Sequence, residues 1–188
     1  MSRAIQFNTD EITESVMQTF WTNGLKTTLK DIEASTRLNK SSIYNTFGNK
    51  DKLFGLAMKC YVNQMEECLN KSLDKYTFKE FVKTILEDAV TDNFNGRGCF
   101  FYNCLGAKHA LSQKNKKVLD TVYLQVREIF ENRISLAKER NDLDTNLCIP
   151  GYATLLMTTI AGLRAFNISG LPKDDLENAA AVAFLRLT

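Results

Sequence analysis

Helix-breaking residues are scarce in this 188-residue chain, and that scarcity constrains its fold more than any other feature. Only two prolines occur, Pro150 and Pro172, so long stretches can continue as uninterrupted helix. Apolar residues recur at steps of four in Ile12, Val16 and Phe20, the spacing of one helix face. The sequence therefore predicts an all-α protein of about nine helices. The expected helices cover residues 8–22, two turns after Thr28, and residues 40–46, 50–72, 77–92, 100–111, 113–140, 150–168 and 173–186.

The composition is that of an ordinary globular protein with little net charge. The formal charge is +2, so any contact with nucleic acid must come from a local surface rather than from a general basic field. The five cysteines are an odd number, and the polar start of the chain is unlike a secretory leader, so we expect reduced thiols in a cytoplasmic protein. The most apolar stretch, residues 148–163, falls short of the roughly 20 residues of a membrane span. No membrane association is expected.

Residues 28–47 contain two short helices joined by a turn of a few residues. Thr28 begins the first of them with Asp31 three positions later, a capping-box-like start, and Asn39 can cap the second. The second helix carries small polar and basic side chains in place of bulky ones. This arrangement is typical of a helix-turn-helix unit whose second helix enters the major groove of DNA, which is about 12 Å wide.

The polar residues of this segment divide into groups that read bases and groups that hold phosphates. Ser41, Ser42, Tyr44 and Asn45 are expected to face base edges, where an amide can pair with adenine. Lys50, at the start of the next helix, combines a cation with free backbone N–H groups and is expected to hold a phosphate. The predicted DNA-binding residues are Lys26, Thr28, Lys30, Arg37, Asn39, Lys40, Ser41, Ser42, Tyr44, Asn45 and Lys50.

Four segments carry a family resemblance: residues 12–20, 28–32 (TLKDI), 38–47 (LNKSSIYNTF) and 49–54 (NKDKLF). Their apolar positions and caps resemble the N-terminal signature of TetR/AcrR-family regulators. The resemblance implies a homodimer that binds a palindromic double-stranded operator, usually as a repressor, and leaves DNA when a small apolar or amphipathic effector binds. Residues 1–49 are then the DNA-binding domain, and residues 50–188 are the ligand-sensing and dimerisation domain.

The chain departs from the family pattern at three places. Arg37 stands where the family usually has glycine, so the turn accepts a non-glycine residue at a cost of roughly 1 kcal/mol, or the turn has another geometry, or Arg37 contacts DNA. Asn45 and Thr46 replace a common His-Tyr pair, which removes one phenol and changes the expected operator preference. The loop from Gly24 to Thr28 is one residue shorter.

The last two predicted helices favour dimerisation. Residues 150–168 and 173–186 carry wide apolar stripes, with small Ala161 and Gly162 allowing close approach of another helix. By resemblance, two such helices from each subunit form a four-helix interface through residues of about 150–187. The alternative is that the stripes pack only within one subunit. A dimer also sets two recognition helices about 34–36 Å apart, matching successive major grooves.

Residues 98–105 gather thiols, aromatic rings and an amide, and the only histidine of the chain follows them. Apolar walls with a few polar groups are typical of a ligand pocket, although an ordinary helix core has the same composition. The residues predicted to bind the effector are Cys99, Phe100, Tyr102, Asn103, Cys104 and His109. An alternative is a redox- or electrophile-responsive regulator in which Cys99 or Cys104 reacts, activated by the nearby Arg97.

No enzymatic motif is recognisable. There is no nucleophile elbow, no glycine-rich phosphate loop and no metalloprotease pair of histidines, so we expect no catalytic residues, no cofactor and no metal site. A further alternative is a ligand-binding module that has lost DNA binding, for which the unusual Arg37 and Thr46 are the supporting features. In a regulator, the helix that starts at Lys50 is expected to transmit the effector signal to the recognition helices.

Overall fold

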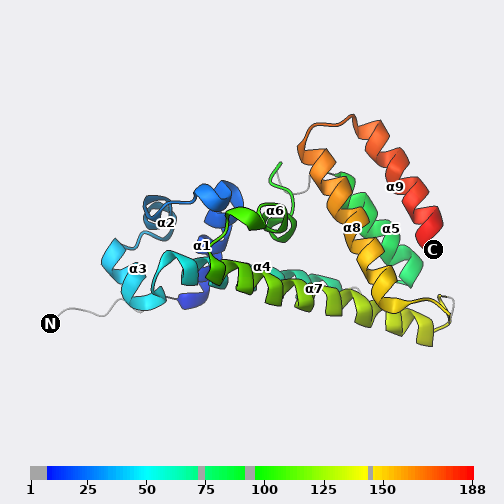
Figure 1. Cartoon of the computed structure of the whole chain (residues 1–188), viewed down its shortest axis with the longest axis horizontal. Helices are drawn as coiled ribbons and strands as arrows, with labels where there is room; N and C mark the ends of the chain where they lie inside the picture. Colours follow the sequence, from blue (N-terminus) through cyan, green and yellow to red (C-terminus); the bar gives the residue numbers. More distant parts are fainter. Residues whose placement is uncertain (1–7, 72–74, 92–95, 144–145) are drawn as a thin grey trace.

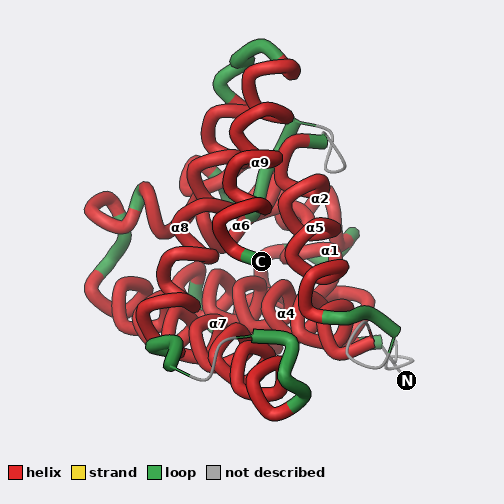
Figure 2. Tube along the Cα trace, turned by 90° about the vertical axis from the view of Figure 1, so that its right-hand side faces the viewer, coloured by secondary structure: helices red, strands yellow, loops and turns green. Residues whose placement is uncertain are grey.

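The computed structural model describes residues 8–71, 75–91, 96–143 and 146–188, and within these ranges the chain is helical with no strand (Figure 2). The predicted all-α fold of about nine helices is therefore confirmed. The elements are α1 (Thr9–Asn23), the 3-10 turn η1 (Gly24–Lys26), α2 (Leu29–Thr36), α3 (Lys40–Phe47), α4 (Lys50–Lys71), α5 (Phe78–Val90), α6 (Phe100–Gly106), the 3-10 turn η2 (Lys108–Ala110), α7 (Gln113–Glu139), α8 (Ile149–Ile168) and α9 (Lys173–Leu187).

Side-chain caps set the starts of the short helices. At α2, the Asp31 backbone N–H donates to Thr28 Oγ1 while the Thr28 backbone N–H donates to Asp31 Oδ2 at 2.7 Å. The hydrogen bonds from Thr28 lower the pKa of the Asp31 carboxyl. At α3, Asn39 Oδ1 accepts from the Ser42 backbone N–H at 2.8 Å. The predicted capping box and asparagine cap are both present.

The turn between α2 and α3 contains the non-glycine residue at the family's glycine position. Arg37 has φ of 57° and ψ of 20°, a left-handed conformation. Of the three alternatives for this residue, the geometry corresponds to the first, a turn that accepts arginine at a cost of about 1 kcal/mol. The following residue, Leu38, is buried and anchors the turn in the core.

One predicted helix is shorter in the structure than expected. The helix expected over residues 100–111 ends at Gly106, and residues 108–110 continue as a 3-10 turn, so His109 lies outside α6. Ser72 and Asp92, where the expected helices over residues 50–72 and 77–92 end, lie outside the described residues.

The helices form a small module at one end and a body at the other, with α4 and α7 running lengthwise beneath them (Figure 1). In the module, Phe20, Ile32, Ile43 and Leu53 from the first four helices are all buried together. Because α4 supplies part of that core and also runs into the body, it mechanically joins the two parts.

The two long helices lie side by side and run in the same direction. Near their starts, Asn115 Nδ2 of α7 donates to Asp51 Oδ1 of α4 at 3.0 Å. Further along, Gln125 Nε2 of α7 donates to Glu66 Oε2 of α4 at 3.3 Å. These paired contacts fix the register between the helices.

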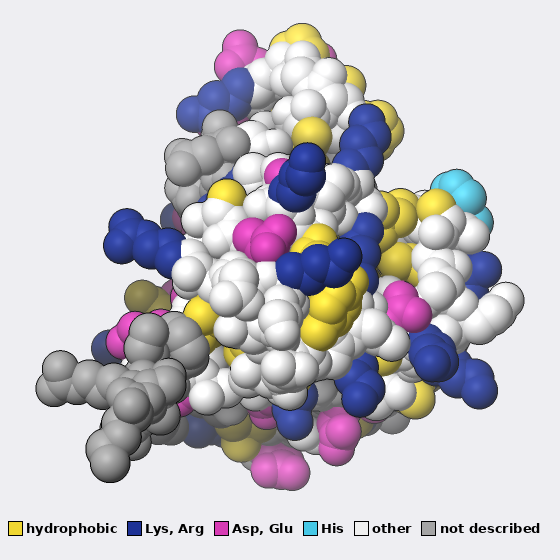
Figure 3. Space-filling view, turned by 90° about the vertical axis from the view of Figure 1, so that its left-hand side faces the viewer, with side chains coloured by type: hydrophobic (Ala, Val, Ile, Leu, Met, Phe, Trp, Pro, Cys, Tyr) yellow, Lys and Arg dark blue, Asp and Glu magenta, His cyan; other side chains and the backbone are white. Residues whose placement is uncertain are grey.

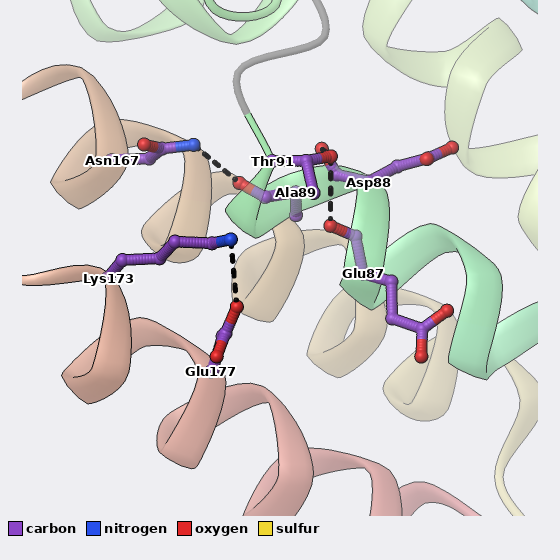
Figure 4. A network of polar contacts seen from close by, with 7 residues as sticks. All are labelled: Glu87, Asp88, Ala89, Thr91, Asn167, Lys173 and Glu177. Carbon is purple, nitrogen blue, oxygen red and sulfur yellow. Dashed lines mark hydrogen bonds and ion pairs between the residues drawn. The ribbon is translucent and has the colours of Figure 1, made fainter.

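The far end of the body is built from α5, α8 and α9. Asn167 Nδ2, near the end of α8, donates to the Ala89 carbonyl of α5 at 3.4 Å, as Figure 4 shows. Lys173 and Glu177 form an ion pair one turn apart on α9. The Tyr152 hydroxyl of α8 donates to the carbonyl of Leu187 at the end of α9. The Asn167 and Tyr152 contacts therefore connect α8 to α5 and to α9.

Candidate nucleic-acid interface

The recognition helix α3 has one buried face and one exposed face. Ile43 is 0% exposed and packs into the module core. On the other face, Lys40, Ser41, Tyr44 and Asn45 are all exposed. The helix therefore offers a narrow, polar and cationic surface, the shape and chemistry that a major groove requires.

Two of these exposed side chains lie against each other. Lys40 Nζ is 5.8 Å from the centre of the Tyr44 ring, one helical turn away. A cation over an aromatic ring contributes about 0.5–1 kcal/mol at an exposed site. The contact holds the ammonium beside the N-terminus of α3, where the helix dipole also attracts phosphate.

The other predicted DNA-binding residues fall into two groups. Lys26, Lys30, Arg37 and Lys50 are exposed and have the charge to contact phosphates. Thr28, Asn39 and Ser42 take part in helix caps, so their first role is to shape the module. Figure 3 shows Lys and Arg side chains spread over this end of the molecule, with a few acidic ones between them.

The start of α4 brings a helix N-terminus and an exposed lysine together next to α3. Asn49 Oδ1 accepts from the Lys52 backbone N–H at 3.0 Å. Lys50 is the first residue of the helix and is exposed beside it. The positive end of a 22-residue helix and a lysine therefore occur together at the module surface.

A polar and aromatic junction joins the module to the body. Trp21 Nε1 of α1 donates to the Gly98 carbonyl at 2.9 Å. The Arg97 guanidinium lies 4.2 Å from the Trp21 ring and donates to Gln18 Oε1 at 2.8 Å. Sequence reasoning missed this junction, because helical periodicity carries no information about partners so far apart in the chain.

The segment predicted to bind the effector is mostly core. Phe100 is 1% exposed, and its ring packs edge-on against Tyr61 of α4. Cys99 and Cys104 are buried, and the Tyr61 hydroxyl donates to Cys99 Sγ at 3.2 Å. Tyr102 is half-buried and burial raises its pKa. This packing favours the ordinary helix core that was the alternative for these residues.

The remaining polar groups of that segment do not converge on a cavity. Asn103 Nδ2 donates to the Arg97 carbonyl at 2.7 Å, and His109 is exposed. A neighbouring cavity of about 120 Å³ is lined by Gly98, Arg164 and Asn167 among others, and by none of the predicted ligand residues.

The geometry contradicts the conditions that a reactive thiol needs. Burial raises the pKa of the Cys104 thiol to about 12, whereas a sensor thiol must be exposed and have a low pKa. Arg97, the proposed activating cation, stacks on Trp21 and binds Gln18. The redox alternative built on Cys99 or Cys104 therefore lacks its structural basis.

Alkylation provides a direct check. Near neutral pH, iodoacetamide is expected to modify the exposed Cys68 and Cys148 and to spare Cys99 and Cys104 in the folded protein, as read by peptide mass spectrometry. Labelling of Cys104 as fast as Cys68 would restore the thiol-sensor hypothesis.

The buried Cys104 thiol also makes the stability of the fold depend on pH. Because its folded-state pKa is raised from 9.0 to about 12, its contribution to the free energy of unfolding is fully present below pH 9.0 and is lost as the pH rises towards about 12.

A larger cavity of about 470 Å³ opens between α4, α5 and α7. Its apolar lining includes Leu69, Phe81 and Leu136. Arg133, which is buried, also lines it, with Nη2 donating to the Tyr76 carbonyl at 3.1 Å and the guanidinium 4.7 Å from the Phe81 ring. The sequence did not reveal Arg133, because a single arginine on a long charged helix is usually solvated.

Two further properties concern the described residues only. No helix among them is both long and apolar enough to cross a membrane. No group of three or more His, Cys, Asp or Glu side chains within the described ranges is arranged to hold a metal ion.

Comparison with known proteins gives the class of the molecule. Residues 12–57 match the family model of bacterial regulatory proteins of the tetR family. No curated protein matches the chain. A cysteine mutant of the TetR family regulator CifR, bound to a 26-base-pair operator DNA, is similar with a TM-score of 0.79 at 22% identity, covering 97% of this chain and 98% of that one.

Two other solved structures are also similar. A TetR family regulator from Cytophaga hutchinsonii has a TM-score of 0.83 at 16% identity and covers 100% of this chain and 96% of that chain. The reduced form of Escherichia coli NemR has a TM-score of 0.76 at 16% identity, with 92% of this chain and 95% of that chain covered. At these identities, the likeness establishes the fold.

Fold and module together define a DNA-binding transcription regulator. Its N-terminal module, over residues 12–57, matches the tetR family model, and the chain has the fold of solved TetR family regulators. The family resemblance predicted from the segments between residues 12 and 54 is therefore confirmed.

Proposed function

We propose that this chain is a homodimeric transcription regulator that binds a palindromic operator and is released from it by a small effector. The observation that carries the proposal is α3, whose Ile43 is buried in the module while Lys40, Ser41, Tyr44 and Asn45 face solvent. A helix with this surface, next to the lysine-bearing start of α4, supports DNA reading and phosphate contact from one face of the module.

Dimerisation is supported by apolar side chains that the subunit leaves uncovered. On α8, Leu155 and Phe166 are more than half exposed. On α9, Val182 is 60% and Leu185 is 74% exposed. Large apolar side chains gathered at one end of a protein typically mark an interface. We therefore assign the dimer contact to these two helices, within residues of about 150–187.

For the effector, the cavity between α4, α5 and α7 is a better site than the segment predicted from the sequence. Its volume of about 470 Å³ and its mixed lining suit a small amphipathic molecule. The cavity is lined by the C-terminal half of α4, whose N-terminus carries Lys50. An effector that binds better when the recognition helices are misplaced would shift the population away from the DNA-bound form.

This function requires no catalysis, and we propose that the chain is not an enzyme. Because a regulator must reach DNA, we place its action in the cytoplasm of a bacterial cell.

Selection of bound duplexes from a random pool tests the proposal. The expected product is an inverted repeat whose half-sites are about one helical turn, roughly 34–36 Å, apart. Enrichment of a single half-site without symmetry would contradict the dimer. Absence of any enriched duplex at low salt would instead support a ligand-binding module that has lost DNA binding.

A further inference from the structure

A second groove lies where the DNA-binding module meets the body, separate from the effector cavity. It has a volume of about 590 Å³ and is lined by Phe47 at the end of α3 and by one face each of α4 and α7. On α4 the lining residues Lys52, Leu56 and Lys59 follow helical spacing, and on α7 Val118 and Val122 do the same. The groove therefore follows two helices that run in the same direction.

The lining of the groove is mostly apolar and includes the two lysines Lys52 and Lys59. Gly55 has no side chain, which leaves space in the groove: a Cβ at that position would be in van der Waals contact with Val118, 3.7 Å from its Cγ2 atom. Leu56, which lines the groove, is 37% exposed. Because most of the exposed lining is apolar, an alkyl chain can lie along Leu56, Val118 and Val122.

The charges around the groove favour an anion. Lys52 and Lys59 are both exposed, and no carboxylate is among the residues that line the groove. The Asp51 carboxylate accepts from Asn115 of α7, and the Glu66 carboxylate accepts from Gln125, which lines one end of the groove, so both carboxylates already have a partner on α7. Seven residues of helix separate the two lysines by about 10 Å, so a cation is close to the head group whichever way the chain lies.

We propose that this groove binds a monomeric aliphatic carboxylate of the fatty-acid type. The alkyl chain lies along Leu56, Val118 and Val122, and the carboxylate pairs with Lys52 or Lys59. The occupant contacts Phe47 and so touches the end of the recognition helix, which gives the site a physical connection to the DNA-binding surface.

Titration calorimetry of the full chain with decanoate, below its micelle concentration and without DNA, tests the site. Saturable binding of decanoate is expected, with decanol weaker and decyltrimethylammonium unbound, because only the carboxylate complements the lysines. Equal binding of the cationic amphiphile would overturn the assignment, as would the absence of saturable decanoate binding.

Variants locate the site. Leu56→Gln is expected to weaken decanoate binding about tenfold or more, because it places an amide against the alkyl chain. The double variant Lys52→Gln with Lys59→Gln is expected to lower decanoate affinity to that of decanol. Matched controls are Leu124→Gln, an exposed leucine of α7 outside the groove lining, and Lys71→Gln at the far end of α4; neither should change the affinity.

Two results would assign the groove or the ligand differently and so refute the proposal. Loss of decanoate binding in Leu69→Gln but not in Leu56→Gln would place the ligand in the cavity between α4, α5 and α7. A change of sedimentation coefficient in Leu56→Gln would identify the groove as a contact between copies of the chain. Neither result depends on operator binding, so the proposed regulatory function is tested separately.

Discussion

Introducing glutamate at both Val182 and Leu185 of α9 is expected to convert the proposed dimer to monomers and to abolish tight operator binding. Both side chains are largely exposed in the single subunit, so the replacements should leave its fold intact. In the dimer, each glutamate would be an unpaired charge in an apolar interface, at a cost of about 3 kcal/mol or more. The dissociation constant of the dimer should rise more than about 100-fold. Sedimentation velocity measures the oligomeric state, and fluorescence anisotropy with a labelled operator measures affinity.

The matched control is Leu124→Glu. Leu124 is also exposed, at 54%, but lies on α7 outside the assigned interface. It should sediment like the wild type and bind the operator normally. A doubly substituted α9 that remained dimeric and kept full affinity would exclude this helix from the interface.

Replacing Lys50 or Tyr44 with alanine is expected to weaken operator binding without loss of helicity, since both side chains are exposed. Lys50→Ala should reduce the affinity for every duplex by a similar factor and flatten the dependence of log affinity on log salt by about one per subunit. Tyr44→Ala should reduce affinity for the operator by about tenfold or more, because a lost base contact costs roughly 1–3 kcal/mol, and should leave the salt dependence unchanged. Anisotropy titrations at several salt concentrations measure both effects.

Lys71→Ala serves as the matched control for Lys50→Ala. It removes the same charge from the opposite end of α4, far from the module. If Lys71→Ala flattened the salt dependence as much as Lys50→Ala, the effect would come from total charge and not from a phosphate contact. Wild-type affinity in both Lys50→Ala and Tyr44→Ala would contradict the assigned interface.

The module could be predicted from the sequence because its determinants are local. The caps at Thr28 and Asn39 act within three residues, and the inward positions Ile43 and Phe47 follow from helical period alone. The left-handed conformation of Arg37 could also be predicted, because the residue at this position of the turn must adopt it if the turn is preserved. Local rules therefore determined both the helices and the exposed surface of α3.

The body could not be predicted to the same depth because its partners are distant in the chain. Helix α8 is apolar on most sides, so the sequence did not distinguish Leu156, which is buried, from Leu155, which is exposed. Residues 99–104 have the composition of a ligand pocket, but their thiols and two of their three aromatic rings are buried in the core. Arg133 became the buried cation of a cavity only through packing of α5 and α4 against α7. Side-chain composition alone does not decide between such outcomes.

Trp21 is the only tryptophan in the chain, and it lies at the joint between α1 and the loop before α6, with its ring under Arg97 and its N–H bonded to Gly98. Any rotation of the DNA-binding module against the body must change the environment of this indole. The protein thus contains an intrinsic fluorescent reporter at this junction, and its emission spectrum can test the proposed rearrangement in solution without an attached dye.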